Sequence, residues 1–258
     1  MSIKAISFDF WNTLFTEQPG TTLFHKQRRR SLLAEAVGAY REISHSELDA
    51  ACLIEREAHE ITWREQHRTS HAAQRVSSIL SQLEVSLPDV ERAELAAGFE
   101  EIILEHPPLL VSGAREVLID LSGRYRLGII SDVGFSPGRV LKRVLADNGL
   151  IEMFDSLVFS DEAGRAKPHR EVFERTARSL GAKPEAIVHI GDLERTDIIG
   201  AKQSGFRAIR FTGVTPMEAH ETTVADFVTS EITEIPRLVE LMRKSVVSSP
   251  LSVACDAN

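Results

Sequence analysis

The chain has few cysteines, no long apolar segment and no excess of positive charge. Its two cysteines, Cys52 and Cys255, lie far apart without metal-type spacing, so we expect neither a disulfide scaffold nor a zinc site. No apolar run approaches the roughly 18 residues that span a bilayer, and the first residues do not resemble a signal peptide. These absences favour a cytoplasmic protein that does not insert into a membrane.

The charge balance is acidic. Lys and Arg number 30 against 38 Asp and Glu, a formal net charge of −8, which argues against nucleic acid or an anionic membrane surface as the main partner. The hydrophobic share of 43% and charged share of 26% are ordinary for a globular protein. With 258 residues the chain can bury a sizeable core in one domain or two. Its oligomeric state cannot be inferred from these properties.

Convincing strand patterns are absent from residues 22–106, where apolar residues instead recur at helical spacing. Ser44 and Glu47 have the spacing of a capping box, and Pro88 suits the first turn of a further helix. Four stripes follow, and their members are Leu33, Ala36, Val37 and Tyr40; Ala51, Ile54, Ala58 and Ile61; Val76, Ile79, Leu80 and Leu83; and Leu95, Phe99 and Ile102. We therefore predict an inserted helical domain over 17–106, with hinges near residues 16–20 and 106–108.

Some side chains of this helical segment have two readings. The run Arg28-Arg29-Arg30 favours a solvated helix face, with contact to an anionic substrate as the alternative. Trp63 is expected to pack in the core rather than to form a stacking platform. Arg56 and Arg64 are further candidates for substrate contact, because a lid over the site would set specificity.

Outside this segment, strands and helices alternate. Buried-strand patterns cover 6–8, 126–131, 156–159, 186–190, 208–211 and 227–228, and helical patterns cover 114–121, 139–147, 170–180, 196–204 and 236–243. This alternation predicts an α/β fold with right-handed crossovers and a doubly wound parallel sheet. The predicted core domain comprises 1–16 plus 107–243, and residues 244–258 are expected to form a flexible tail.

Polar side chains follow four of the predicted strands. Asp9 ends the first strand, Ser131 ends another, Lys167 lies past the strand at 156–159, and Asp192 and Asp197 belong to the loop after the strand at 186–190. Each alone has an ordinary structural explanation, as a turn hydroxyl, an exposed loop charge or a helix cap. Because open α/β sheets bind ligands at the carboxyl ends of their strands, the combination predicts one shared site.

These fragments resemble motifs I to IV of the haloacid dehalogenase-like (HAD) hydrolase superfamily. The resemblance covers the chain outside the helical segment, and its most specific parts are the Lys167-Pro168 loop and the Gly-Asp-x-x-x-x-Asp loop at 191–197. The family has a Rossmann-like core, and the position of the helical segment between motifs I and II matches the C1-type helical cap of many members. The resemblance implies a Mg²⁺-dependent phosphohydrolase.

The implied chemistry assigns a role to each motif residue. Asp9 would be the nucleophile, forming an aspartyl-phosphate that splits one displacement into two steps. Lys167 would offset the repulsion between Asp9 and an incoming anion, and Ser131 would donate to a phosphoryl oxygen.

A second group of residues is implied as the Mg²⁺ site. Mg²⁺ prefers hard oxygen ligands and retains several waters. The resemblance assigns ligation to the carboxylates of Asp9 and Asp192 and to the backbone carbonyl of Trp11. Asp197 would be either a further ligand or a partner that holds a bound water.

Trp11 departs from the phosphatase pattern, in which a second Asp stands two residues after the nucleophile and serves as the general acid. Indole cannot perform this role. Three consequences are open. The enzyme acts on acyl or aryl phosphates with good leaving groups, another residue such as Glu17, His25 or Glu194 supplies the proton, or the substrate is not a phosphate.

The third consequence leads to one alternative function, a haloacid dehalogenase, and Trp11 separately motivates another, a binding or regulatory protein on a HAD scaffold with little turnover. Dehalogenases of the superfamily have an aromatic Tyr at this position, but their last motif resembles Ser-x-Asn. Here Asp192 and Asp197 are both present, and with Asp9 they form a set of carboxylates that repel each other unless a cation binds. The sequence therefore favours a metal-dependent phosphohydrolase acting on a small phosphorylated metabolite.

Overall fold

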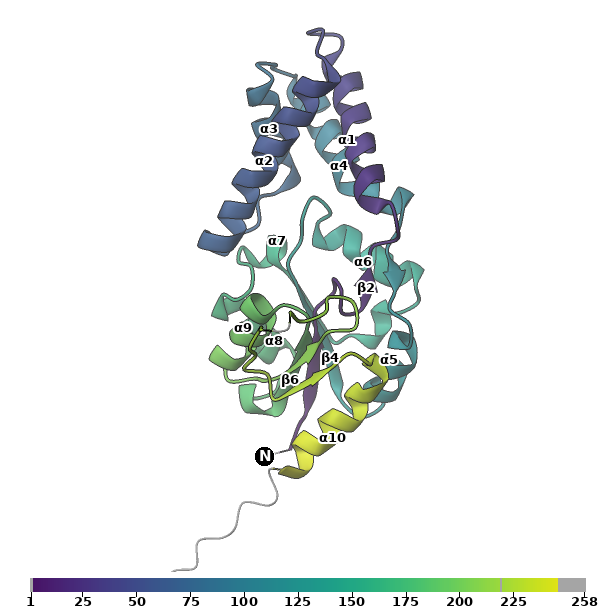
Figure 1. The fold of residues 1–258 in the computed structure, drawn as a ribbon, viewed down its shortest axis with the longest axis vertical. Helices are drawn as coiled ribbons and strands as arrows, with labels where there is room; N and C mark the ends of the chain where they lie inside the picture. Colours follow the sequence, from purple (N-terminus) through teal and green to yellow (C-terminus); the bar gives the residue numbers. More distant parts are fainter. Residues whose placement is uncertain (1, 219, 246–258) are drawn as a thin grey trace, which may run out of the picture.

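The structure, a computed structural model, describes residues 2–218 and 220–245. Its centre is a six-stranded sheet in the order β5-β4-β1-β6-β7-β8, and all neighbouring strands are parallel (Figure 1). The strands are β1 (Ala5–Phe8), β4 (Arg126–Ser131), β5 (Ser156–Phe159), β6 (Ile187–Gly191), β7 (Arg207–Phe211) and β8 (Phe227–Thr229). The predicted doubly wound α/β fold is confirmed.

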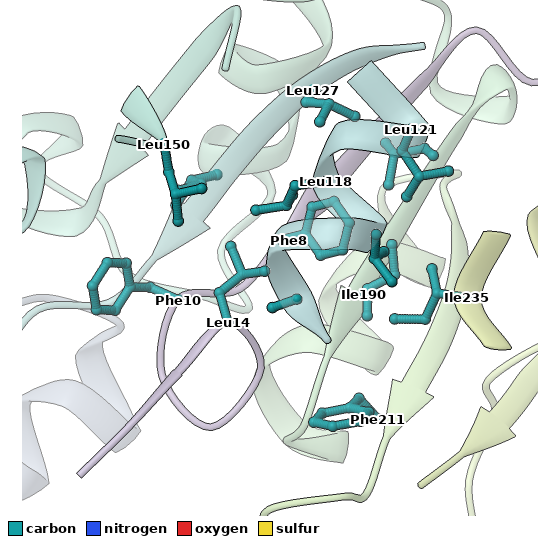
Figure 2. Close-up of a cluster of buried hydrophobic side chains, with 14 of the residues drawn as sticks. Phe8, Phe10, Leu14, Leu118, Leu121, Leu127, Leu150, Ile190, Phe211 and Ile235 are labelled. Atoms are coloured by element: carbon teal, nitrogen blue, oxygen red, sulfur yellow. The ribbon is translucent and has the colours of Figure 1, made fainter. Parts of the chain in front are cut away.

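Helices cover both faces of this sheet. One face packs against α5 (Ala114–Ser122), α6 (Gly138–Asp147) and α10 (Ile235–Ser245), and the other against α8 (Arg170–Ser179) and α9 (Ile199–Gln203). Side chains alternate between the faces along each strand, so Ile6 and Phe8 of β1 join the first cluster whereas Ala5 joins the second. Figure 2 shows part of the first cluster, with side chains from β1, β4, β6, β7, α5 and α10 gathered together.

Four helices form a block at one end of the molecule (Figure 1), and we call α1–α4 the helical block. They are α1 (Thr21–Val37), α2 (His45–Gln66), α3 (Ala72–Gln82) and α4 (Asp89–Glu105), and they enclose a hydrophobic cluster of their own. Ser44 and Glu47 form the predicted capping box. The predicted stripes on α3 and α4 are buried, but Ile54 and Ile61 of α2 are 47% and 53% exposed, so that stripe was placed on the wrong face.

Two short antiparallel strands, β2 (Phe15–Thr16) and β3 (Leu109–Leu110), pair where the chain leaves and re-enters the α/β core. The sequence patterns did not predict this pair, because two residues are too few to show an alternation. Between β2 and α1, and between α4 and β3, the backbone is not helical, as a hinge requires. The hinge itself and the division at 16/17 and 106/107 stay predictions.

Other differences from the predicted elements are small. A π-helical turn at Glu194–Ile198 occupies the start of the helix predicted at 196–204, which leaves only α9 as α-helix. Helix α10 continues to Ser245, so the first two residues of the predicted tail are helical, and the rest lie outside the described residues. None of the described helices is both long and apolar enough to cross a membrane.

Candidate active site

The loops after β1, β4, β5 and β6 meet at one edge of the sheet and enclose a cavity of about 180 Å³. Parallel strands bring their carboxyl ends to the same edge, which places side chains that are distant in sequence around one space. The lining residues are Asp9, Trp11, Asn12, Trp63, Asp132, Lys167, Asp192, Leu193, Thr196 and Asp197. Four of the five predicted polar residues therefore line one cavity, and Ser131 does not.

Lys167 lies at the centre of the charged groups. Its ammonium donates to Oδ1 of Asp9, to Oδ1 of Asp197 at 2.6 Å and to the carbonyl oxygen of Ile130 at 3.0 Å. Lys167 and Asp197 are 2% and 1% exposed, and Asp9 is 5% exposed. The cation thus binds two buried carboxylates from different loops and holds the loops after β1, β5 and β6 together.

Asp197 is held by four donors. In addition to Lys167, its carboxylate accepts from the Leu193 backbone N–H at 3.1 Å, from the Thr196 hydroxyl at 3.2 Å and from His189 Nε2 at 3.2 Å. A Cβ atom at Gly191 would lie 2.4 Å from the Asp197 side chain. Only glycine at 191 leaves room for the carboxylate to fold back against the strand end.

Sequence reasoning missed His189, which supports Asp197 from within β6. His189 is fully buried, and its Nδ1 lies 2.9 Å from the Ser7 hydroxyl of β1, its Cα partner in the sheet. A carboxylate only accepts hydrogen bonds, so Nε2 must carry the ring proton and Nδ1 accepts from Ser7. The local sign was that Ser7 and His189 each stand as a polar residue within an otherwise apolar strand, but their pairing across 182 residues is set by the sheet.

Burial raises the pKa values of Asp9 and Asp197 and the Lys167 cation lowers them, but the net shift is upward for Asp9 and downward for Asp197. Burial raises the pKa of Asp9 well above its usual range, with Asp197 and Asp192 adding to the rise and Lys167 opposing it. For Asp197, burial acts in the same direction, but Lys167 and His189 outweigh it and hold the pKa well below its usual range. Burial lowers the pKa of His189, which keeps the ring neutral.

Asp9, Asp192 and Asp197 have the composition and spacing of a metal site. One oxygen from each lies within 4.8 Å of the others, and all three residues are buried. Hard carboxylate oxygens in a small polar cavity fit Mg²⁺, and the single Lys167 leaves the set with excess negative charge that a divalent cation would balance. Thr215 donates to Oδ2 of Asp192 at 2.9 Å and fixes that carboxylate.

The Trp11 loop turns sharply directly after Asp9. Asn12 has a left-handed backbone with φ of 55°, and the bonds that close the loop run from Asn12 N to Phe15 O and from Phe15 N to Phe10 O. Neither closing bond uses the Trp11 carbonyl oxygen, and its use as a metal ligand stays a prediction.

The loop after β4 differs from expectation, because Asp132 rather than Ser131 lines the cavity. Ser131 is buried and its hydroxyl donates to the Asp132 carbonyl at 3.1 Å. Asp132 accepts from the Lys167 backbone N–H at 2.9 Å and from Trp63 Nε1 at 2.8 Å. Donation by Ser131 to a phosphoryl oxygen stays a prediction that requires its hydroxyl to rotate.

The expectation that Trp63 packs in a core was wrong. Trp63 is half-buried, lines the cavity, and has the Arg195 guanidinium 4.3 Å from its ring centroid. Its indole N–H donates to the half-buried Asp132 carboxylate, so the end of α2 docks on the sheet edge through a polar contact. Two further hydrogen bonds join the segment after α2 to the loops of the core: the Ala166 N–H donates to the His67 carbonyl oxygen at 2.8 Å, and the Thr69 and Ser160 hydroxyls lie 2.6 Å apart.

None of the three residues predicted as substitutes for the missing general acid lines the cavity. Glu194 accepts from the Val224 N–H, the Thr223 hydroxyl and Arg210, which turns it toward the 221–226 segment. Glu17 is exposed, and His25 lies on α1 with its Nε2 buried and unpartnered.

Comparison with known proteins agrees with this geometry. A family model of haloacid dehalogenase-like hydrolases matches residues 3–205. The chain belongs to this family. The chain is 31% identical over 137 residues to a glyceraldehyde 3-phosphate phosphatase of Pyrococcus furiosus, and the match covers 52% of this chain and 55% of that protein. The chain therefore spans about half the length of the relative that it matches in sequence.

Solved structures of HAD proteins share the fold across the chain. A 2-haloacid dehalogenase of Pseudomonas syringae has a TM-score of 0.71 at 21% identity, covering 93% of this chain and 99% of that one. A HAD phosphatase of Thermococcus onnurineus has a TM-score of 0.67 at 23% identity, covering 93% and 100%. At these identities both neighbours support the fold alone, and the fold is common to two reactions.

Proposed function

We propose that this HAD hydrolase is a Mg²⁺-dependent phosphohydrolase that acts on a small phosphorylated metabolite through an aspartyl-phosphate on Asp9. The observation that carries the proposal is the buried cluster of Asp9, Asp192 and Asp197 around Lys167. A dehalogenase expels halide and needs no metal, so it does not require a metal-ligating carboxylate such as Asp192 beside the nucleophile. A phosphoryl group brings negative charge that a metal ion and a lysine neutralise.

Asp9 and Asp192 are the proposed carboxylate ligands, together with the Trp11 carbonyl. Asp197 already accepts from four donors, and we therefore assign it to holding Lys167 and a metal-bound water rather than to direct ligation. Mg²⁺ would supply charge neutralisation at the phosphoryl oxygens. Lys167 opposes the rise in the pKa of Asp9 and so favours its ionised form, and its hydrogen bond fixes the Asp9 carboxylate at the cavity.

The reaction has two displacements. An Asp9 carboxylate oxygen attacks phosphorus, the bond from phosphorus to the ester oxygen breaks, and the leaving group departs with the electron pair. Water then attacks the phosphorus of the aspartyl-phosphate and loses a proton. The bond to Asp9 breaks, inorganic phosphate leaves, and the free carboxylate is restored.

Trp11 determines which esters react quickly. Trp11 lines the cavity where a general acid would be needed, and its indole cannot supply a proton. Asp132 also lines the cavity, but each of its two carboxylate oxygens accepts a hydrogen bond from an N–H group. The leaving oxygen must therefore depart largely unprotonated. Since general acid catalysis contributes roughly a hundredfold to ten-thousandfold, acyl and aryl phosphates should react faster than alkyl phosphates by this order.

The test is phosphate release from aryl, acyl and alkyl phosphates, each measured with Mg²⁺ and with chelator. Mg²⁺-dependent turnover that is lost in Asp9→Asn supports the proposal, and a steep dependence on leaving-group pKa supports the role of Trp11. Alkyl turnover at the aryl rate would contradict that role. Halide release from 2-haloacids without metal would favour a dehalogenase, and absence of both reactions would favour a binding scaffold.

A further inference from the structure

A second, larger cavity of about 530 Å³ lies between the helical block and the loop after β4. Helices α1, α2 and α3 form most of its wall, and Gly134 and Phe135 close it from the side of the sheet. This volume is in the range that holds a small organic molecule, whereas the cavity at Asp9 has room for little more than a phosphoryl group and a metal ion.

The wall of this cavity is positively charged, although the chain as a whole carries a formal charge of −8. Four cationic and two acidic side chains line it. Both acids are paired: Glu55 accepts from Arg75 at 2.9 Å in a buried ion pair, and Asp49 lies 3.0 Å from Lys26. The remaining cations include Arg29, which has no acidic partner within 4.0 Å among residues 2–218 and 220–245.

Arg29 is half-buried in the wall of this cavity, and its guanidinium has no anionic partner among the described residues. Its Nε is shut off from solvent and has no hydrogen-bond partner, and its Cζ lies 4.6 Å from the centroid of the Phe135 ring. Burial lowers its pKa only to about 10, so the group stays charged at neutral pH. A buried charge is costly unless paired, and a guanidinium stacked on an aromatic ring keeps its edge free for a planar oxyanion.

Helix α2 and the loop after β4 each contribute lining residues to both cavities. Arg56 lines the large cavity and Trp63 lines the cavity at Asp9, seven residues later on one helix, which corresponds to about 10 Å. Phe135 follows Asp132 by three residues, so their Cα atoms are at most about 11 Å apart. Cys52, Arg56, His59 and Trp63 have i, i+4 and i+3 spacing and share one face of α2.

We infer that the large cavity is a subsite for a second oxyanion of the substrate, bound by Arg29, and that the preferred substrate spans two cavities whose lining residues on α2 lie about 10 Å apart along the helix. The second oxyanion is a carboxylate or a second phosphoryl group. Phe135 and the aliphatic wall contact the part of the molecule between the two anions. This inference rests on the proposed function, because it deepens the substrate class of the same site.

Matched aryl phosphates test the inference with phenol leaving groups of nearly equal acidity. The first pair is 3-(4-phosphonooxyphenyl)propanoate against 4-propylphenyl phosphate, and the second is (4-phosphonooxyphenyl)acetate against 4-ethylphenyl phosphate, which shortens the span. The bisphosphate 4-(2-phosphonooxyethyl)phenyl phosphate distinguishes a phosphoryl group from a carboxylate. We expect the anionic member of at least one pair to have a kcat/KM about tenfold to a hundredfold higher, the worth of a hydrogen-bonded charge pair.

Two variants assign the preference to Arg29. In Arg29→Met the preference should fall to near one while turnover of 4-propylphenyl phosphate is retained, and Arg29→Lys should keep part of it. The matched control is Arg28→Met, because Arg28 binds Glu105 at 2.8 Å and does not line the cavity. A loss of activity in Arg29→Met that is equal for both members of a pair would mean that Arg29 only supports the fold, and would overturn the subsite.

Calorimetric binding of the same compounds to Asp9→Asn protein separates this inference from the proposed function. Turnover without any preference at either span would overturn the subsite and leave the phosphohydrolase intact. An Arg29-dependent binding preference without turnover in the wild type would support the subsite and remove the proposed reaction. Absence of both turnover and preference would overturn both.

Discussion

Removing the charge of Lys167 should destabilise the protein as well as stop the reaction. In Lys167→Met, two carboxylates that are 5% and 1% exposed, those of Asp9 and Asp197, lose their shared cation. Breaking a buried ion pair from one side costs about 3–5 kcal/mol, because the remaining charge stays desolvated. For a chain of this size, that corresponds to a fall in Tm of about 6–20 °C.

The loss of stability in Lys167→Met should depend on pH in a defined direction. Lys167 has a raised pKa in the folded protein, so its contribution is fully present near neutral pH and is lost only at high pH. In the variant, nothing opposes the upward shift of the Asp9 pKa, and that carboxyl takes up a proton as the pH falls. The stability difference between wild type and Lys167→Met should therefore shrink as the pH is lowered from neutral.

Urea unfolding followed by circular dichroism, in the presence of chelator, measures both effects. Lys202→Met is a matched control, because Lys202 pairs with Asp226 at 2.8 Å with both side chains about one-third exposed, and this pair should contribute at most about 1 kcal/mol. A loss for Lys167→Met no larger than that of the control, or a loss that grows as the pH falls, would refute the assignment of Lys167 as the counter-ion of the buried carboxylates.

Two further substitutions test the supports of the site and of the helical block. Gly191→Ala would place a Cβ 2.4 Å from the Asp197 side chain, so we expect at least a tenfold loss of kcat. Gly123→Ala is the control, because a Cβ there would meet only the Asp120 carbonyl oxygen, at 3.9 Å; unchanged kcat in Gly191→Ala would contradict the close approach. Glu55→Gln should lower the free energy of unfolding by about 3 kcal/mol, since Arg75 is 5% exposed, and a loss below about 1 kcal/mol would contradict a buried pair.

Local sequence patterns predicted most of the α/β core. Buried strands such as 126–131 are short apolar runs bounded by turn residues, and the helices between them have a regular apolar period, so each element is encoded by its own residues. The convergence of Asp9, Lys167, Asp192 and Asp197 was also predictable, because parallel strands bring their ends to one edge.

Long-range contacts could not be predicted in the same way. The Asp132 carboxylate is met by Trp63 from a helix 69 residues away, and His189 reaches Ser7 across 182 residues. Neither pairing leaves a local pattern, and the general burial tendency of tryptophan pointed to the wrong environment for Trp63. The stripe on α2 was misplaced for a related reason, since apolar residues occur on two faces of that helix and only packing selects one.

The sequence by itself determined the order of strands and helices, the family and the set of charged residues at the sheet edge, because these follow from local periodicity and from motifs within single loops. Only the tertiary structure decided which residues share a cavity. Lys167 binds Asp9 and Asp197 at once, and the middle arginine of an apparently solvated run turns toward Phe135. Side-chain environments of this kind depend on how elements from different parts of the chain pack together, which no single segment encodes.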